Sequence, residues 1–196
     1  KNFRAQISNL KNSMTTPGEA LENAESFYDV KVAEVYSSYE KKLMMANALD
    51  FDDLLIKTVE LLQTNESILK FWSNKFQFIM VDEYQDTNLV QYKLVELLAS
   101  NNKNVCVVGD SDQSIYAFRG ADIRNILEFE KDFKDAKLIQ LDKNYRSTKK
   151  ILNLANSIIS NNDRKIDKNL WTDNPEGDEI SSIRFTSEKD EARWIA

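Results

Sequence analysis

The stretch that most constrains the fold of this chain runs from residue 78 to residue 86. Residues 78–81 are apolar and favour β structure, and the carboxylates of Asp82, Glu83 and Asp86 follow directly. A short apolar run without alternation is typical of a strand that is buried on both faces, as in parallel sheets. Ligands of open α/β sheets bind outside the carboxyl ends of the strands. The sequence therefore places an acidic pair where a ligand would bind.

The adjacent acids Asp82 and Glu83 have two interpretations. Magnesium is a hard cation that is usually held by one or two carboxylates together with substrate phosphates. A Walker B site uses one Asp to hold this metal and a second acid to position or activate a nucleophile. The alternative is a strand that ends in acidic residues because its end is exposed. The acid pair alone leaves both interpretations open.

Composition excludes several classes of protein and of site. The chain has 196 residues, 42% of them hydrophobic, which is enough for one or two domains with a real core. Its single cysteine, Cys106, excludes an internal disulfide and suits a reducing compartment, and the apolar run 105–108 around it predicts a core position. The absence of histidine removes His-based mechanisms and most zinc sites. A net charge of −6 means that any contact with DNA must use a local surface.

Residues 1–75 read as helix throughout. Thr16 with Glu19 is a helix start signal, and an apolar stripe follows on one long helix or on two helices that meet near Ser37. Asp50 with Asp53 predicts the start of another helix. At helical spacing the aromatic residues of this region are expected in the core rather than on nucleic acid; these are Phe27, Tyr28, Tyr36 and Tyr39.

From residue 78 onward, strand and helix patterns alternate. Strands are expected at 78–81, 105–108 and 138–141, and helices are expected to begin near Asn88, after Asp122 and after 147–148. Strands separated by helices of this length predict right-handed crossovers and a parallel sheet. Farther on, the pattern predicts a loop at 161–179, a strand at 180–185, and a last helix capped by Ser187 with Asp190.

Three blocks in this second part carry a family resemblance. Residues 82–88 read DEYQDTN, residues 108–122 read VGDSDQSIYAFRGAD, and residues 141–148 read LDKNYRST. In this order and at these distances they resemble helicase motifs II, III and IV of superfamily 1, in the UvrD/PcrA/Rep group. Weaker matches extend the resemblance to 49–54 and 171–177, so that it covers nearly the whole chain.

The resemblance implies a role in ATP hydrolysis for residues of each block. Asp82 would hold magnesium, and Glu83 would orient or deprotonate the attacking water. Gln113 would contact the γ-phosphate and report its presence to the DNA-binding side. Tyr145 would stack on the adenine, and Arg146 would act as an arginine finger. For Arg146 the alternative is an ordinary surface ion pair.

The resemblance also implies a DNA-binding surface and supporting residues. Tyr116 and Phe118 would offer flat faces to the bases of single-stranded DNA. The family commonly has Trp at the position of Phe118, so stacking is kept with less area. Arg119 would tie this loop to the acidic site, while Gln85 and Asp86 would make interdomain hydrogen bonds around it. The alternative for Tyr116 and Phe118 is packing beneath their own loop.

The expected fold is α/β, a partial parallel sheet of a RecA-like P-loop NTPase with an N-terminal all-helical insertion domain. The resemblance divides the chain into the end of the helical insertion (1–75), the second half of the first RecA-like domain (76–144) and the start of the second (145–196). No glycine precedes a lysine, so these residues contain no Walker A sequence. The later family motifs are not present either, which implies an internal fragment.

The predicted function is part of an ATP-dependent 3′-to-5′ DNA helicase, with ATP and Mg²⁺ as cofactors. Single-stranded and partly duplex DNA and the rest of the parent chain are the expected partners, in a cytoplasmic, nucleoid-associated protein of DNA repair or replication without a membrane segment. Residues 1–196 alone are expected to be inactive. The alternatives are the helicase part of a helicase–nuclease, or a non-catalytic module that binds DNA or a partner.

Overall fold

The computed structural model describes residues 3–162 and 168–196, and it separates into two compact units, Lys1–Ala136 and Lys137–Ala196. The structure is mixed α/β with a small two-stranded parallel sheet in the first unit. The finer division into segments 1–75, 76–144 and 145–196 stays a prediction.

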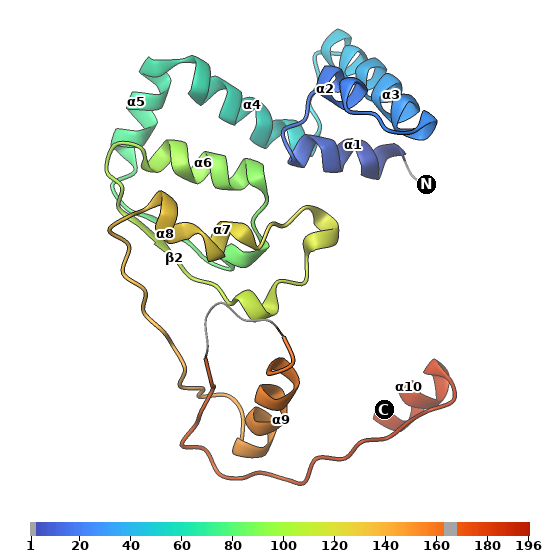
Figure 1. Ribbon diagram of the computed structural model, residues 1–196, viewed down its shortest axis with the longest axis vertical. Coiled ribbons are helices and arrows are strands. Elements are labelled where there is room, and N and C mark those ends of the chain that lie inside the picture. Colours follow the sequence, from blue (N-terminus) through green and yellow to red (C-terminus); the bar gives the residue numbers. More distant parts are fainter. Residues whose placement is uncertain (1–2, 163–167) are drawn as a thin grey trace. The chain divides into compact units, whose positions relative to one another are not determined.

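The first unit begins with helices only, as the sequence predicts for residues 1–75 (Figure 1). Capping residues account for where these helices start. The side chains of Thr16, Ser26 and Asp50 each accept a hydrogen bond from the backbone amide of the third residue of the helix. In return, the side chain of that third residue accepts a hydrogen bond from the backbone amide of the cap residue. The helices of this region are α1 (Phe3–Asn12), α2 (Pro17–Glu22), α3 (Phe27–Met45), α4 (Phe51–Thr64) and α5 (Glu66–Lys75).

The structure decides two expectations for this helical region. Helix α3 passes through Ser37 without a break, so two helices that meet near Ser37 are not observed; the apolar stripe is instead divided between α2 and α3, because the capping box of Ser26 with Asp29 starts a new helix there. The aromatic stripe is only partly core: Tyr36 is buried, but Phe27 is 78% exposed. Phe27 is the first residue of α3, where the side chain has no preceding turn to pack against.

A buried lysine joins the helices of this region. Lys11 on α1 is 1% exposed, and its Nζ lies 2.7 Å from Glu40, 2.9 Å from Asp50 and 2.7 Å from Asp53. Burial alone would lower the pKa of Lys11, but the hydrogen bonds that Lys11 donates to these carboxylates outweigh burial and raise the pKa. Lys11 therefore stays charged and ties α1 to α3 and α4.

The sheet consists of β1 (Ile79–Val81) and β2 (Val105–Val107), which pair in parallel with Ile79 opposite Val105. Helix α6 (Leu89–Ala99) connects them, and it starts at Asn88, as predicted, through a capping box with Gln91. This helix packs against α4 and α5 of the helical region. The connection is therefore a β–α–β unit, which requires both strands to end at the same edge.

Burial of the two strands on both faces is not observed. Met80 is 78% exposed and Cys106 is also exposed, while the residues on either side of each are half-buried. Because neighbouring side chains point to opposite faces, one face of the sheet is covered by described residues and the other is not. The expectation that Cys106 is a core residue is wrong for the same reason.

Short helices follow β2. They are the 3₁₀ helices η2 (Ser111–Gln113) and η3 (Ala117–Arg119) and the helices α7 (Arg124–Leu127) and α8 (Phe129–Asp132). The sequence predicts one helix after Asp122, but the backbone at Glu128 leaves the helical region (φ −114°, ψ 6°) and breaks it in two. This break lets Phe129 lie edge-on against Tyr84, with ring centroids 5.7 Å apart.

The second unit contains α9 (Lys149–Ile159) and α10 (Glu188–Ile195), the latter capped by Ser187 as predicted. The strands expected at 138–141 and 180–185 do not form, and the one bridge among the described residues joins Lys143 to Trp171. A strand forms beside another strand that shares its backbone hydrogen bonds, and the sheet of the described residues consists of β1 and β2 alone. Part of the predicted loop, 163–167, lies outside the described residues.

Candidate functional site

The carboxyl ends of β1 and β2 meet at one edge and are joined by backbone hydrogen bonds. The amide of Val108 donates to the carbonyl of Val81 (2.8 Å), and the amide of Tyr84 donates back to the carbonyl of Val108 (3.0 Å). The residues that follow each strand are thereby brought side by side. These are the acidic segment after β1 and the segment beginning at Gly109 after β2.

Glu83 lies in a strained backbone conformation at this edge. Its φ of 51° and ψ of 42° place it in the left-handed region, which costs a residue with a side chain roughly 1–2 kcal/mol. The amide of Glu83 donates to Oδ1 of Asp82 (2.9 Å). Both side chains are exposed. Strain of this kind is common at functional sites, where the surrounding structure maintains it.

Gln85 supplies that surrounding structure. Its side chain is buried, with 1% of the residue exposed. Its Nε2 donates to Oε2 of Glu83 (2.8 Å), and its Oε1 accepts from the amide of Asp110 (2.9 Å). Gln85 thus links the acid after β1 to the loop after β2. These partners lie within the first unit, whereas the sequence predicted interdomain hydrogen bonds for Gln85.

Gly109 is required for this link. A Cβ at residue 109 would lie 2.5 Å from Oε1 of Gln85 and 3.1 Å from the amide nitrogen of Tyr84. Any side chain would displace the buried amide of Gln85. Sequence reasoning assigned no role to Gly109, although a glycine directly after a strand is a signal of close backbone approach.

Asp110 extends the link to Gln113. One oxygen of Asp110 accepts from Nε2 of Gln113 (2.9 Å), and the other accepts from the amide of Asp112 (2.9 Å). A continuous chain of hydrogen bonds therefore runs from Glu83 through Gln85 and Asp110 to Gln113. Sequence reasoning selected both ends of this chain but missed Asp110.

Tyr84 and Asp86 form the buried side of the acidic loop, which is residues 82–86 after β1. Burial raises the pKa of Tyr84 to about 12, so its hydroxyl stays protonated. In the described structure, Oδ1 of Asp86 is buried without a hydrogen-bond partner. A buried carboxylate oxygen that lacks a donor is unfavourable, so Asp86 has the capacity to bind a further donor.

The acidic edge of the sheet, formed by Asp82 and Glu83 at the end of β1, suits a metal that is shared with a ligand rather than one held by protein alone. The described residues contain no group of three or more His, Cys, Asp or Glu side chains placed to hold a metal ion. The exposed carboxylate of Asp82 offers hard oxygen ligands, and magnesium commonly needs only one or two of these when phosphates supply the rest. The residues present therefore fit Mg²⁺ that arrives with a phosphorylated ligand.

The aromatic residues of the loop after β2 lie together near its surface. The ring centroids of Tyr116 and Phe118 are 5.9 Å apart, and Phe118 is 72% exposed. Gly120, in the left-handed region at φ 87°, ends η3 directly after them. The side chain of Arg119 lies outside the described part of the structure.

Tyr145 and Arg146 belong to the second unit, where a turn holds their backbone. Oδ1 of Asn144 accepts from the amides of Arg146 (2.8 Å) and Ser147 (2.7 Å). Tyr145 is exposed, and Nζ of Lys143 lies 5.4 Å from the centre of its ring. Sequence reasoning found the tyrosine and the arginine but assigned no role to Asn144.

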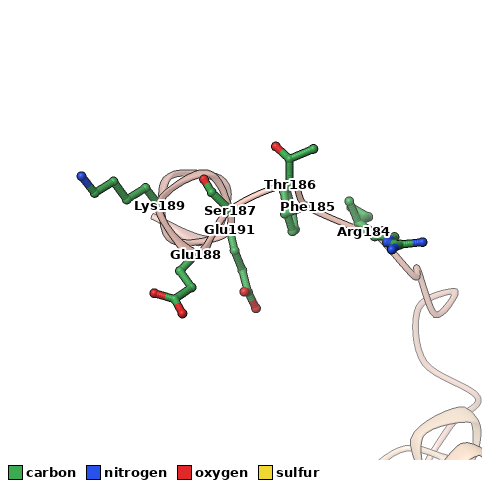
Figure 2. A pocket seen from close by; sticks show the side chains of 8 residues that line it. Arg184, Phe185, Thr186, Ser187, Glu188, Lys189 and Glu191 are labelled. Carbon is green, nitrogen blue, oxygen red and sulfur yellow. The ribbon is translucent and has the colours of Figure 1, made fainter.

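The hollow at the start of α10 offers no comparable site. It has a volume of about 710 Å³ and is lined by residues 183–189 and Glu191. Figure 2 shows Lys189 pointing to one side of the helix, while Glu188 and Glu191 extend below it. Polar groups do not converge there, as they do at the edge of the sheet.

Comparison with known protein families places a boundary close to the one between the two compact units. Residues 1–134 match the UvrD/REP helicase N-terminal domain, and residues 139–196 match the UvrD-like helicase C-terminal domain. The chain belongs to the UvrD/REP helicase family. The resemblance inferred from the three motif blocks is thereby confirmed.

Curated relatives extend beyond this chain. The ATP-dependent DNA helicase PcrA of Staphylococcus aureus strain Mu50 is 53% identical over 193 residues, which are 98% of this chain and 26% of that helicase. The ATP-dependent DNA helicase PcrA of Staphylococcus epidermidis is 52% identical over the same shares of both chains. The chain thus spans about a quarter of the length of the relatives it matches. No helix among the described residues is long and apolar enough to cross a membrane.

Proposed function

We propose that this chain is part of the motor of an ATP-dependent DNA helicase that moves 3′ to 5′ along single-stranded DNA, in repair or replication. The observation that carries the proposal is the chain of hydrogen bonds from Glu83 through Gln85 and Asp110 to Gln113. It joins the acid expected at the attacking water to the amide expected at the γ-phosphate. Membership of a helicase family supports the same function, and both relatives compared above are ATP-dependent DNA helicases.

The residues of the acidic edge divide the work of hydrolysis between them. Asp82 would hold Mg²⁺, which offsets the charge of the phosphates when it is bound with ATP. Glu83 would orient the attacking water and accept its proton. Gln85 fixes one carboxylate oxygen of Glu83, leaving the other oxygen for the water. Gln113 would contact the γ-phosphate, and this contact would change the position of the loop that carries Tyr116 and Phe118.

The second unit would contribute Tyr145 to the adenine and Arg146 to the γ-phosphate. The parallel pair β1–β2 supports a RecA-like sheet, with residues 1–75 as an inserted helical domain. Tyr116 and Phe118 would stack on bases of single-stranded DNA, since one of their rings is largely exposed.

Substitution of the two acids in the full-length protein tests this function. Glu83→Gln keeps the shape of the side chain but cannot accept a proton, so ATP should still bind while kcat falls by on the order of 10²–10⁴. Asp82→Asn should instead weaken the Mg²⁺-dependent binding of ATP. Binding of a fluorescent ATP analogue and steady-state hydrolysis on single-stranded DNA measure the two effects separately.

Glu22→Gln, at an exposed position on α2, is the matched control and should leave both quantities unchanged. Normal hydrolysis by Glu83→Gln would contradict the catalytic role of Glu83, whereas absence of hydrolysis in the unsubstituted full-length protein would favour a non-catalytic binding module. Equal binding defects in the two acid variants would contradict the division of roles between Asp82 and Glu83.

A further inference from the structure

The loop that carries Tyr145 and Arg146 is bordered by residues 171–177 of the same unit, a segment called the brace below. At one end of the loop, the amide of Asn144 donates to the carbonyl of Trp171 (2.7 Å). The amide of Trp171 in turn donates to the carbonyl of Asp142 (3.0 Å). These bonds hold the residues just before Tyr145 against the start of the brace.

At the other end of the loop, Asn174 reaches the residue that follows Arg146. Its Nδ2 donates to the carbonyl of Ser147 (3.0 Å). Its own amide donates to Oγ1 of Thr172 (3.1 Å), and Thr172 is buried. A hydrogen bond within the brace therefore holds the backbone of Asn174, while its side chain contacts the loop.

The last part of the brace caps helix α9 in place of a side chain. Thr148 is the N-cap residue of α9, but its side chain makes no capping hydrogen bond. Instead the amide of Lys149 donates to the carbonyl of Pro175 (3.1 Å), and the amide of Lys150 donates to the carbonyl of Glu176 (3.2 Å). The brace thus satisfies amides at the helix start that would otherwise lack partners.

Gly177 makes this approach possible. Its φ of 79° lies in the left-handed region, and a Cβ at this position would come within 2.5 Å of Oγ1 and 2.7 Å of Cβ of Thr148. A larger residue would be strained and would push the brace away from the loop. Gly177 therefore sets how closely the two segments approach.

We infer that the brace is a positioning element for Arg146, with Asn174 and Gly177 as the residues that set its geometry. The inference rests on the role proposed for Arg146 at the γ-phosphate. Asn144 fixes the amide of Arg146 from within the loop, and the brace fixes the backbone on both sides of it. A backbone held on both sides fixes the point from which the guanidinium of Arg146 extends toward the phosphate.

Two substitutions in the full-length protein test the inference. Asn174→Asp removes the donor to Ser147 at constant size, and Gly177→Ala adds the Cβ that meets Thr148. A displacement of about 1 Å at a catalytic group costs roughly 10²-fold in rate. We expect kcat for ATP hydrolysis on single-stranded DNA to fall by this order in both variants. The same substitutions on an Arg146→Ala background should cause no further loss, because the misplaced group is already absent.

Asn153→Asp on the exposed surface of α9 and Gly18→Ala on α2, where a Cβ would lie 4.0 Å from Oγ1 of Thr16, are matched controls that should hydrolyse ATP normally. Thermal unfolding of all variants separates loss of fold from loss of position, and Asn174→Asp decides the matter if Gly177→Ala does not fold. Normal hydrolysis by Asn174→Asp, or an equal loss on the Arg146→Ala background, would overturn the inference while the proposed function stands. Normal hydrolysis by Arg146→Ala alone would overturn the role proposed for Arg146 and the inference with it.

Discussion

Glu83 and Arg146, two of the candidate catalytic residues, lie in loops that are held in place in different ways. The acidic loop after β1 is fixed by its own Gln85, which is buried and lies two residues from Glu83. The loop around Arg146 is fixed from a distance, by Asn174, 27 residues beyond Ser147 in the chain. The first geometry depends on one buried side chain, whereas the second depends on a separate segment staying in contact.

The two loops nevertheless use the same chemistry for this purpose. In both, an uncharged amide side chain binds the candidate catalytic residue: Gln85 donates to the carboxylate of Glu83, and Asn144 accepts from the backbone amide of Arg146. An amide orients its neighbours without adding a charge. The charges of Glu83 and Arg146 thus remain available to a ligand.

The largest effect that separates the loops is expected for Arg146 itself. Arginine fingers in phosphoryl transfer contribute on the order of 10³–10⁵ in rate, so Arg146→Ala should reduce ATP hydrolysis by this factor in the full-length protein. Arg146→Lys keeps the charge but loses the planar fork, so it should restore little activity. Stopped-flow hydrolysis measures the rate, and equilibrium binding of single-stranded DNA should stay near normal.

The two Arg146 variants distinguish the ways in which this prediction could be wrong. Near-normal turnover with Lys would mean that Arg146 supplies only diffuse charge. Near-normal turnover with Ala would mean that the loop around Arg146 does not act on the phosphate, and the comparison with the acidic loop would lose its basis.

A smaller effect is expected when the acidic loop is loosened instead. Gln85→Leu keeps most of the volume but leaves the amide of Asp110 without its acceptor, at a cost of about 1–3 kcal/mol in the free energy of unfolding. Release of Glu83 should lower kcat by roughly 10²-fold, the usual consequence of a misplaced catalytic group. Urea unfolding and steady-state hydrolysis measure the two quantities in the full-length protein.

Gly109→Ala tests the same link from the opposite side, because its Cβ would displace Oε1 of Gln85. Combined with Gln85→Leu, it should add little further loss of turnover. Fully additive losses would mean that Gly109 and Gln85 act independently, and that the acidic loop is not held by their contact.

Local features of this fold could be predicted from the sequence, and pairing over a distance could not. The helix starts at Thr16, Asp50, Asn88 and Ser187 depend on residues three positions apart, and all are observed. The apolar run at 138–141 has the composition of a strand but forms none. A strand forms only where another strand pairs with it and other residues pack on its faces, and the sequence of the run itself does not determine either.

For the candidate site too, some features could be predicted from the sequence and others depend on the fold. The order of the motif blocks identified the family and selected Glu83, Gln113 and Arg146 as residues of interest. The left-handed backbone of Glu83 and the contact of Gln85 with Asp110, 25 residues away, are properties of the folded chain. The brace was visible only as a weak motif match at 171–177, because its contacts with the loop are mostly made by backbone atoms whose partners depend on the fold.

The smallest effect is expected at the far end of the loop after β2, where the acidic edge gives way to the aromatic pair. Base–aromatic stacking is worth roughly 1–3 kcal/mol per base and is largely independent of sequence, so Phe118→Ala should weaken binding of single-stranded DNA by about tenfold. Hydrolysis without DNA should change little, because the bonds of Gln85 and Asp110 are untouched. Fluorescence anisotropy with oligonucleotides of different sequence measures the affinity, and Phe27→Ala, at a similarly exposed phenylalanine on α3, is the control.

Normal DNA affinity in Phe118→Ala would mean that the ring only packs against its own loop. A loss of DNA-free hydrolysis in the same variant would mean that the aromatic end and the acidic edge are one rigid structure rather than two parts with separate tasks.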